Sequence, residues 1–91
     1  MKKKRNKLEI VYDIMRAIMD QKNRVRPTQI LYKSNLSHKM LVEYINELVG
    51  KGLIEEVEED KKRYYCLTKK GFRFIEDYEK VKAFMECYGI E

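Results

Sequence analysis

Tryptophan is absent from this sequence of 91 residues, proline and histidine occur once each, and cysteine occurs twice. The two cysteines, Cys66 and Cys87, form no Cys-x-x-Cys pair, so the ligand set of a zinc site is missing and we expect no metal. A glycine-rich phosphate loop, a carboxylate dyad and a Cys/His pair are missing as well, and His38 stands alone. The sequence therefore predicts neither an enzyme nor a cofactor, and it predicts no small-molecule ligand.

Long uncharged apolar runs are also missing. The two longest apolar segments are helix-like and interrupted by charges, so we expect neither to span a membrane. The basic start MKKKRNK is followed by Glu9, Asp13 and Arg16, whereas a secretory signal needs an uncharged apolar run at that point. Unpaired cysteines without an export signal favour a reducing compartment, so we expect a cytoplasmic protein.

The positive charge is concentrated at the start of the chain. Residues 1–7 carry five bases and no acid, which accounts for the whole net charge of +5. The neutral remainder is divided into blocks, with net charges of +3 over 8–42, −6 over 43–60, +6 over 61–73 and −3 over 74–91. Such blocks bind a polyanion if folding gathers the positive ones on one face, and otherwise they form a soluble, ion-paired surface.

Apolar residues at helical spacing predict a helix from about Lys7 to Gln21, with Leu8, Val11 and Ile18 among its apolar positions. Its apolar arc spans roughly 220°, which is wider than one small core needs, so we expect this helix to contact a partner chain as well. A short edge strand is expected at Val25–Arg26.

A second, short helix is predicted from Thr28, as its N-cap, to Lys33, with Pro27 suited to the entry. Ser34 and Asn35 form a turn, and Ser37 caps a third helix. Leu41, Tyr44, Ile45 and Leu48 form the buried face of that helix, and Gly50 and Gly52 end it.

Two strands are predicted at 53–57 and 63–67, joined by the charged turn EEDKK. Thr68 then caps a last helix that runs to about Tyr88. This order predicts a mainly α fold with a small β-hairpin wing: a winged helix-turn-helix domain over 7–71. A flexible basic tail is expected over 1–6, and a C-terminal dimerisation helix over 72–91.

The last helix carries an apolar seam that extends beyond the winged domain. Its 3, 4, 3 spacing is that of a heptad repeat, and an exposed apolar stripe is unfavourable in water. We therefore expect a homodimer joined by a coiled coil of these helices. The expected interface residues are Tyr78, Val81, Phe84, Met85 and Tyr88.

Opposite the buried side of the third helix lie five residues that we call the reading face: His38, Lys39, Val42, Glu43 and Asn46. In a helix-turn-helix this face enters the major groove of DNA. Asn46 suits adenine, Lys39 suits guanine or phosphate, Glu43 suits cytosine and Val42 suits a thymine methyl group. In the alternative interpretation, Lys39, Glu43 and Glu47 form i, i+4 ion pairs on a solvated surface.

A second group of residues, the phosphate set, is predicted to contact the DNA backbone. Its members lie in turns, at helix ends and where the chain leaves the wing tip, and the free amides of helix starts add partial positive charge that attracts phosphate. They are Lys22, Arg24, Arg26, Lys33, Ser37, Lys61, Lys62, Arg63, Lys69 and Lys70. Five acids between Glu55 and Asp60 stand beside this set. Either only 61–63 contact DNA, or the acids pair with these bases inside the hairpin.

The strings NLSHKMLVEYINELVGKGLIEE and YYCLTKKG resemble the archaeal winged-helix family of small dimeric chromatin-type proteins and predicted transcriptional regulators. The resemblance covers about Leu8 to Tyr88. It implies a homodimer joined by antiparallel C-terminal helices, with two winged domains on duplex DNA. The acidic wing and the carboxylates on the third helix depart from a generic basic DNA binder.

We therefore expect a nucleoid-associated transcriptional regulator that binds double-stranded DNA, with self and DNA as its partners. Two alternatives stay open. One is a sequence-independent chromatin protein, and the other is a winged helix used as a protein–protein interaction module.

Overall fold

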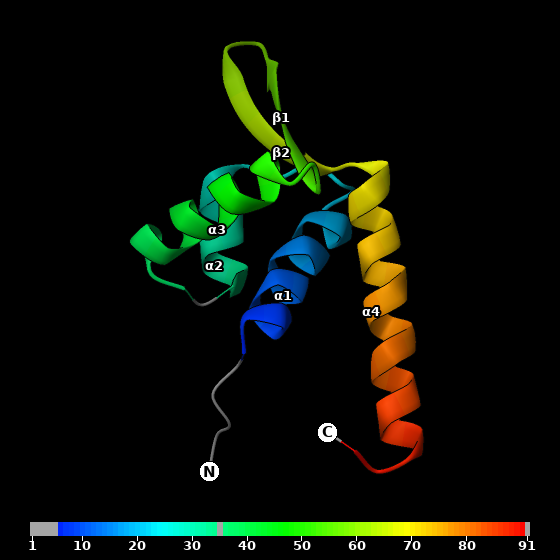
Figure 1. Cartoon of the computed structure of the whole chain (residues 1–91). Coiled ribbons are helices and arrows are strands. Elements are labelled where there is room, and N and C mark those ends of the chain that lie inside the picture. Colours follow the sequence, from blue (N-terminus) through cyan, green and yellow to red (C-terminus); the bar gives the residue numbers. More distant parts are fainter. Residues whose placement is uncertain (1–5, 35, 91) are drawn as a thin grey trace.

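The computed structural model describes residues 6–34 and 36–90. Its elements, in chain order, are α1 (Lys7–Asp20), α2 (Pro27–Ser34), α3 (His38–Gly50), β1 (Ile54–Glu59), β2 (Lys62–Leu67) and α4 (Lys69–Cys87). The first three helices pack together, the hairpin projects from one end of them, and α4 runs beside α1 and beyond it (Figure 1). The predicted fold class is confirmed. Within the described residues, no helix is both long and apolar enough to cross a membrane.

The hydrophobic core centres on α1. Ile14, Met15 and Ile18 are fully buried there and lie in one cluster with Ile30 from α2 and Leu48 from α3. These positions recur at the helical period, which is why one stripe of α1 supplies most of its core contacts. The core therefore holds α3 with its opposite side turned to solvent.

The start of α1 is closed by Asn6, a residue that the sequence placed in the basic tail. The Asn6 side chain accepts a hydrogen bond from the Glu9 amide at 2.8 Å, and the Glu9 carboxylate accepts one from the Asn6 amide at 3.2 Å. This reciprocal pair is a capping box. The predicted tail residues Lys2, Lys3, Lys4 and Arg5 lie outside the described residues.

The helix-turn-helix differs from its prediction at both ends of the second helix, which ends at Ser34, a residue that the sequence placed in the turn. The second helix begins at Pro27, so Thr28 lies inside its first turn and is not the N-cap. Proline suits the first helical position because an N–H group there has no partner within the helix, and proline has no N–H group. The Ser37 cap is confirmed, since its side chain accepts from the Met40 amide at 3.2 Å. The predicted turn residue Asn35 lies outside the described residues.

The wing is longer and its turn tighter than predicted. The strands continue to Glu59 and from Lys62, so the turn is Asp60–Lys61 alone, with φ of 52° and 63°. These left-handed values are the ones that a two-residue hairpin turn requires. The predicted edge strand is confirmed at Val25, whose amide and carbonyl bond to Tyr65 at 3.1 and 2.8 Å.

The junction between the wing and α4 depends on Thr68 and Gly71. As predicted, Thr68 caps α4: its hydroxyl oxygen accepts a hydrogen bond from the Gly71 amide at 3.1 Å. The same hydroxyl donates a hydrogen bond to the Gly52 carbonyl oxygen at 2.5 Å. A Cβ at position 71 would collide with the backbone carbonyl of Leu53. This close contact explains why glycine stands at the last position of the Leu-Thr-x-x-Gly sequence.

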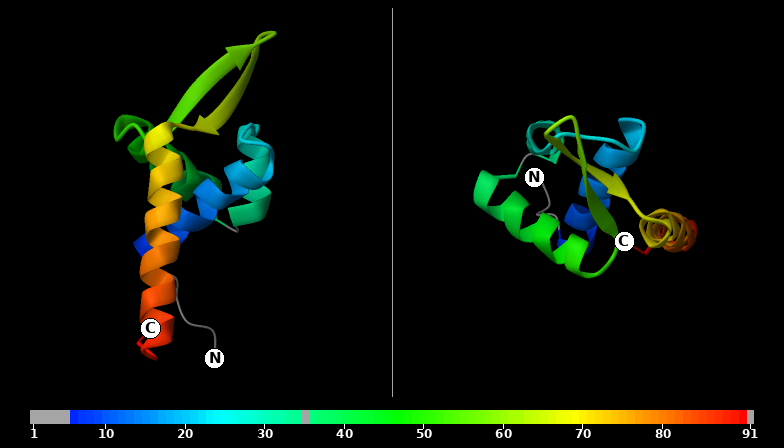
Figure 2. Two further views of the ribbon diagram at one scale, coloured as in Figure 1. Left: turned by 90° about the vertical axis from the view of Figure 1, so that its right-hand side faces the viewer. Right: turned by 90° about the horizontal axis from the view of Figure 1, so that it is seen from above.

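The first half of α4 packs against α1, and its second half extends past it (Figures 1 and 2). The ring of Tyr12 on α1 packs against that of Tyr78, with centroids 4.5 Å apart and the planes tilted by 46°, and the Tyr12 hydroxyl donates to Glu79 Oε2 at 2.6 Å. Part of the wide apolar arc of α1 is thus covered by its own chain. Beyond this contact, Phe84 and Tyr88 are 62% and 68% exposed.

Candidate nucleic-acid interface

The structure brings all five residues of the reading face together on the solvent side of α3. Each of them is exposed, while Leu41, Ile45 and Leu48 on the opposite side are at most 5% exposed. The helical period produces this division, since side chains three and four apart share a face. The result is a mixed polar surface with one apolar member, Val42.

The second carboxylate on this helix does not contribute free charge to the reading face. Glu47 Oε2 lies 2.9 Å from Lys7 Nζ and 3.0 Å from Lys51 Nζ. Hydrogen bonds from Lys7 and Lys51 lower the pKa of Glu47, and the same contact raises the pKa of Lys7. The Lys7 pair also ties the start of α1 to α3.

The i, i+4 alternative for Lys39 and Glu43 is not observed. In the part of the chain that the structure describes, no ion pair within 4.0 Å joins these two side chains. Glu47 pairs with residues outside that series. Lys39, Glu43 and Asn46 therefore keep their polar groups available to solvent or to a ligand.

Arg24 and Arg26 lie against the wing, on the face of β2 that carries Tyr64. Their guanidinium carbons stand 5.0 and 5.6 Å from the centre of the Tyr64 ring, within the range of cation–π contact. Arg24 also reaches Glu59, with Nη2 to Oε2 at 2.6 Å. A phosphate that approaches Arg24 must compete with this carboxylate.

Basic residues on β2 partly balance the negative charge of the acidic strand β1. In the ladder Glu58 faces Arg63 and Glu59 faces Lys62, and Arg63 Nε lies 3.8 Å from Glu56 Oε2. Of the two interpretations of the wing, pairing between its acids and these bases is therefore observed for Arg63. The partner of Arg24 comes from the same acidic run.

The remaining members of the phosphate set lie in turns and near helix ends. Lys61 and Lys62 are exposed at the wing tip, and Lys22 is exposed in the turn after α1 with φ of 60°. Lys69 is exposed, Lys70 Nζ donates to the Lys51 carbonyl at 2.9 Å, and the Ser37 hydroxyl serves as the helix cap. The side chain of Lys33 lies outside the described part of the structure.

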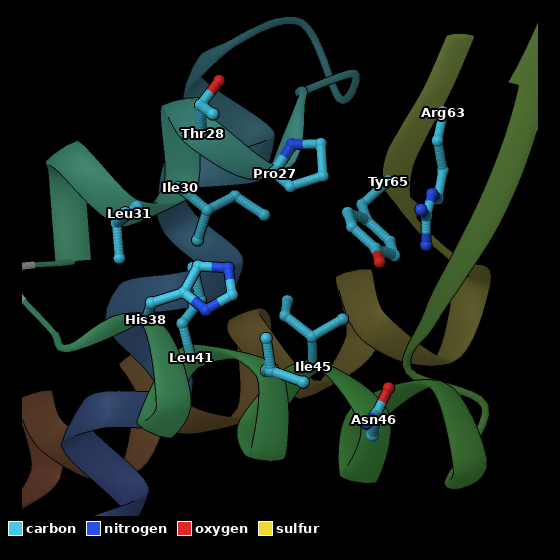
Figure 3. A pocket seen from close by; sticks show the side chains of 11 residues that line it. Pro27, Thr28, Ile30, Leu31, His38, Leu41, Ile45, Asn46, Arg63 and Tyr65 are labelled. Carbon is cyan, nitrogen blue, oxygen red and sulfur yellow. The ribbon is translucent and has the colours of Figure 1, made fainter. Parts of the chain in front are cut away.

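A cavity of about 310 Å³ between α2, α3 and β2 was not foreseen from the sequence (Figure 3). Its walls include Tyr65 and Thr28, which the sequence assigned to a strand and a cap, together with reading-face residues. It depends on how three elements are spaced, and no local pattern encodes that spacing. No group of three or more metal-ligating side chains occurs among the described residues.

Three packed helices, the third with an exposed polar face, followed by an antiparallel hairpin and a long helix, define a winged helix-turn-helix domain. The chain belongs to the winged helix-turn-helix family, whose family model matches residues 4–86. The resemblance inferred from the sequence is thereby confirmed.

The chain is similar to the uncharacterized protein MJ0290 of Methanocaldococcus jannaschii, with 31% identity over 78 residues. That alignment covers 86% of this chain, but the chain spans only 34% of the relative's length. Among solved structures it resembles Sso10a-2, a DNA-binding protein from Sulfolobus solfataricus, with a TM-score of 0.77, 23% identity and coverage of 93% and 87% of the two chains.

It also resembles TubR, solved on 24 bp of tubC from Bacillus thuringiensis serovar israelensis, with a TM-score of 0.70 and 17% identity over 79% of this chain and 81% of that one. At such identities both structures establish the shared fold alone.

Proposed function

We propose that the protein binds double-stranded DNA as a homodimer and acts as a transcriptional regulator, with α3 of each copy in a major groove. The observation that carries this proposal is the reading face, where Lys39, Glu43 and Asn46 are exposed and make no ion pair within the described residues. An α-helix fits the major groove, and polar side chains free of partners are the groups that read base edges.

Each residue of the reading face has a base-edge partner that suits its chemistry. The Asn46 amide donates and accepts at once and matches adenine, and Lys39 donates to guanine. Glu43 accepts from the cytosine amino group and repels phosphate, so it favours a particular base over the backbone. Val42, 43% exposed, offers an apolar contact to a thymine methyl group.

Contacts to phosphate are expected mainly from the lysines of the phosphate set that make neither an ion pair nor a side-chain hydrogen bond among the described residues: Lys22, Lys61, Lys62 and Lys69. Arg24 and Arg63 join them only when phosphate displaces Glu59 and Glu56. The wing therefore positions the domain weakly, and α3 carries most of the discrimination.

The second half of α4 supports the proposed homodimer. Val81, Phe84 and Tyr88 are 53%, 62% and 68% exposed and lie on one side of a helix that has left the domain. A matching helix from a second copy covers this stripe, as in a coiled coil. Tyr78 also contacts Tyr12 and Phe74 of its own chain, so it lies at the start of the proposed seam.

Salt-dependent binding to a duplex of about 30 bp, measured by fluorescence anisotropy, tests the proposal. With roughly six phosphates neutralised, the logarithm of the affinity should fall with the logarithm of salt with a slope of about −5. Lys39→Gln should weaken binding roughly tenfold, consistent with a contact worth about 1–3 kcal/mol. The matched control is Lys80→Gln on α4, away from α3, which should bind like the wild type. No duplex affinity even at low salt would refute DNA binding and favour a protein–protein module.

A further inference from the structure

The cavity between α2, α3 and β2 has the dimensions of a small-molecule site. Its volume of about 310 Å³ lies at the lower end of the range for ligand pockets. Ile30, Leu41 and Ile45, all nearly buried, form its apolar floor, and Pro27 closes one side (Figure 3). A flat apolar ring is the shape that such a floor accommodates.

One polar group in the wall has no hydrogen-bond partner among the described residues. Tyr65 is 8% exposed, and its phenol hydroxyl makes no hydrogen bond to any described residue, although its backbone is bonded to Val25. A phenol hydroxyl without a protein partner can donate a hydrogen bond to a ligand oxygen in the cavity. The ring of Tyr65 and the guanidinium of Arg63 project from the same strand into one end of the cavity (Figure 3).

The charge of the lining favours an anion. Among the described residues that line the cavity, Arg63 is the single charged side chain, and none is a carboxylate. Glu56 is the acid that contacts Arg63, and its Oε2 lies 3.8 Å from Arg63 Nε, a contact too long for a hydrogen bond. The exposed side chains of His38 and Asn46 add hydrogen-bonding groups on the α3 side of the cavity.

We propose that this cavity binds a single-ring aromatic carboxylate. The ring lies on Ile30, Leu41 and Ile45, while the carboxylate accepts hydrogen bonds from the Arg63 guanidinium and the Tyr65 hydroxyl. Arginine suits this role because its planar donors match the two oxygens of a carboxylate.

The position of the cavity gives the ligand a regulatory effect, and this part rests on the proposed function. His38, Val42 and Asn46 belong to the cavity wall and to the reading face at once, and Arg63 belongs to the phosphate set. A bound acid therefore competes with DNA for the same side chains, and each ligand lowers the affinity for the other by the same factor.

Titration of the DNA-free protein with benzoate, followed by ¹H–¹⁵N NMR, tests the site without any assumption about DNA. Saturable shifts should appear at residues of the lining, with a dissociation constant on the order of 1 mM. Benzamide, which keeps the ring and lacks the charge, and acetate, which keeps the charge and lacks the ring, should each bind at least tenfold more weakly.

Two variants locate the contact. Arg63→Gln should weaken benzoate at least tenfold, and Tyr65→Phe should weaken it several-fold with the fold retained, because only the hydroxyl is removed. The matched control is Arg73→Gln, which makes the same charge change on α4 and should leave benzoate binding unchanged. Shifts that do not saturate up to about 10 mM, or that are equal in Arg63→Gln and Arg73→Gln, would overturn the site.

The regulatory effect is measured separately, by repeating the anisotropy assay at saturating benzoate. Duplex affinity should fall at least fivefold for the wild type, and Tyr65→Phe should need a several-fold higher benzoate concentration for the same fall. Benzoate binding without an effect on measurable duplex affinity would overturn the competition and leave the site intact. Absence of any duplex affinity would refute the proposed function and leave the NMR result as the test of the cavity.

Discussion

The hydroxyl of Tyr12 on α1 donates a hydrogen bond to Glu79 Oε2 on α4 at 2.6 Å, across 67 residues of sequence. Arg16 Nη1 contacts the same oxygen at 3.1 Å, and the Tyr12 ring packs on Tyr78. These contacts hold the first half of α4 against the domain. They therefore set the direction in which the exposed half of the helix leaves it.

Tyr12→Phe should remove that hydrogen bond and lower the free energy of unfolding by about 1 kcal/mol. Burial and the bond to Glu79 raise the pKa of Tyr12 from 10.0 to about 12. Because the folded-state pKa is raised, the contribution is complete below about pH 10 and is lost as pH rises toward 12. Urea unfolding at a series of pH values should show the difference between wild type and Tyr12→Phe disappear over this range. A difference that grows with pH would contradict the assignment.

Gly71→Ala should destabilise the fold by about 2–3 kcal/mol, because its methyl group would meet the Leu53 carbonyl and leave no room to relax. Gly50→Ala is the control at the end of α3. A Cβ there meets no atom within 4 Å, so the substitution should be neutral or stabilise by up to about 1 kcal/mol. Thermal unfolding of the two variants checks the contrast. Equal melting temperatures would mean that the α4 junction is not close-packed.

Glu59→Gln should strengthen duplex binding by roughly threefold to tenfold, because it releases Arg24 and removes one negative charge from the wing. The salt slope should become steeper by about 0.9 if Arg24 then contacts a phosphate. Glu55→Gln makes the same charge change on the same strand without a bound arginine, so it should change the affinity less. Identical affinities for the two variants would mean that Arg24 takes no part in binding.

Val81→Glu should give monomers in light scattering, because a charge replaces an exposed member of the proposed seam. Val81 is 53% exposed in the single chain, so the substitution should leave the chain folded as a monomer. Ala83→Glu introduces the same side chain on another side of α4 and should remain dimeric. If Val81→Glu stays dimeric, the interface lies elsewhere, and the exposed Leu8 on α1 is the next candidate.

The features that sequence reasoning found are those that a few neighbouring residues encode. The Ser37 and Thr68 caps and the bridge at Val25 each follow from a short local pattern, and all are observed. The predicted buried face of α3 is observed at Leu41, Ile45 and Leu48, whereas Tyr44 is only partly buried. The tight turn was missed because Asp60 and Lys61 both adopt positive φ, which the string EEDKK does not signal. The predicted Thr28 cap is wrong because Pro27 already occupies the first helical position.

The missed interactions of the candidate interface depend on residues far apart in the chain. Arg24 and Glu59 are 35 positions apart and meet only because Val25 pairs with β2. Lys7 reaches Glu47 only because α1 crosses near α3. The reading face itself was predictable, since one helical period defines it, whereas the cavity beside it arises from the spacing of α2, α3 and β2.

Selection from a random-sequence duplex library, carried out with the wild type and with Asn46→Ala, tests the central claim that α3 reads bases. The wild type should enrich a motif of two half-sites, and Asn46→Ala should relax an adenine position in each by about 1–3 kcal/mol without changing the rest. Binding without any enriched motif would contradict base reading and favour a chromatin protein, and an unchanged motif in Asn46→Ala would remove that residue from the reading face.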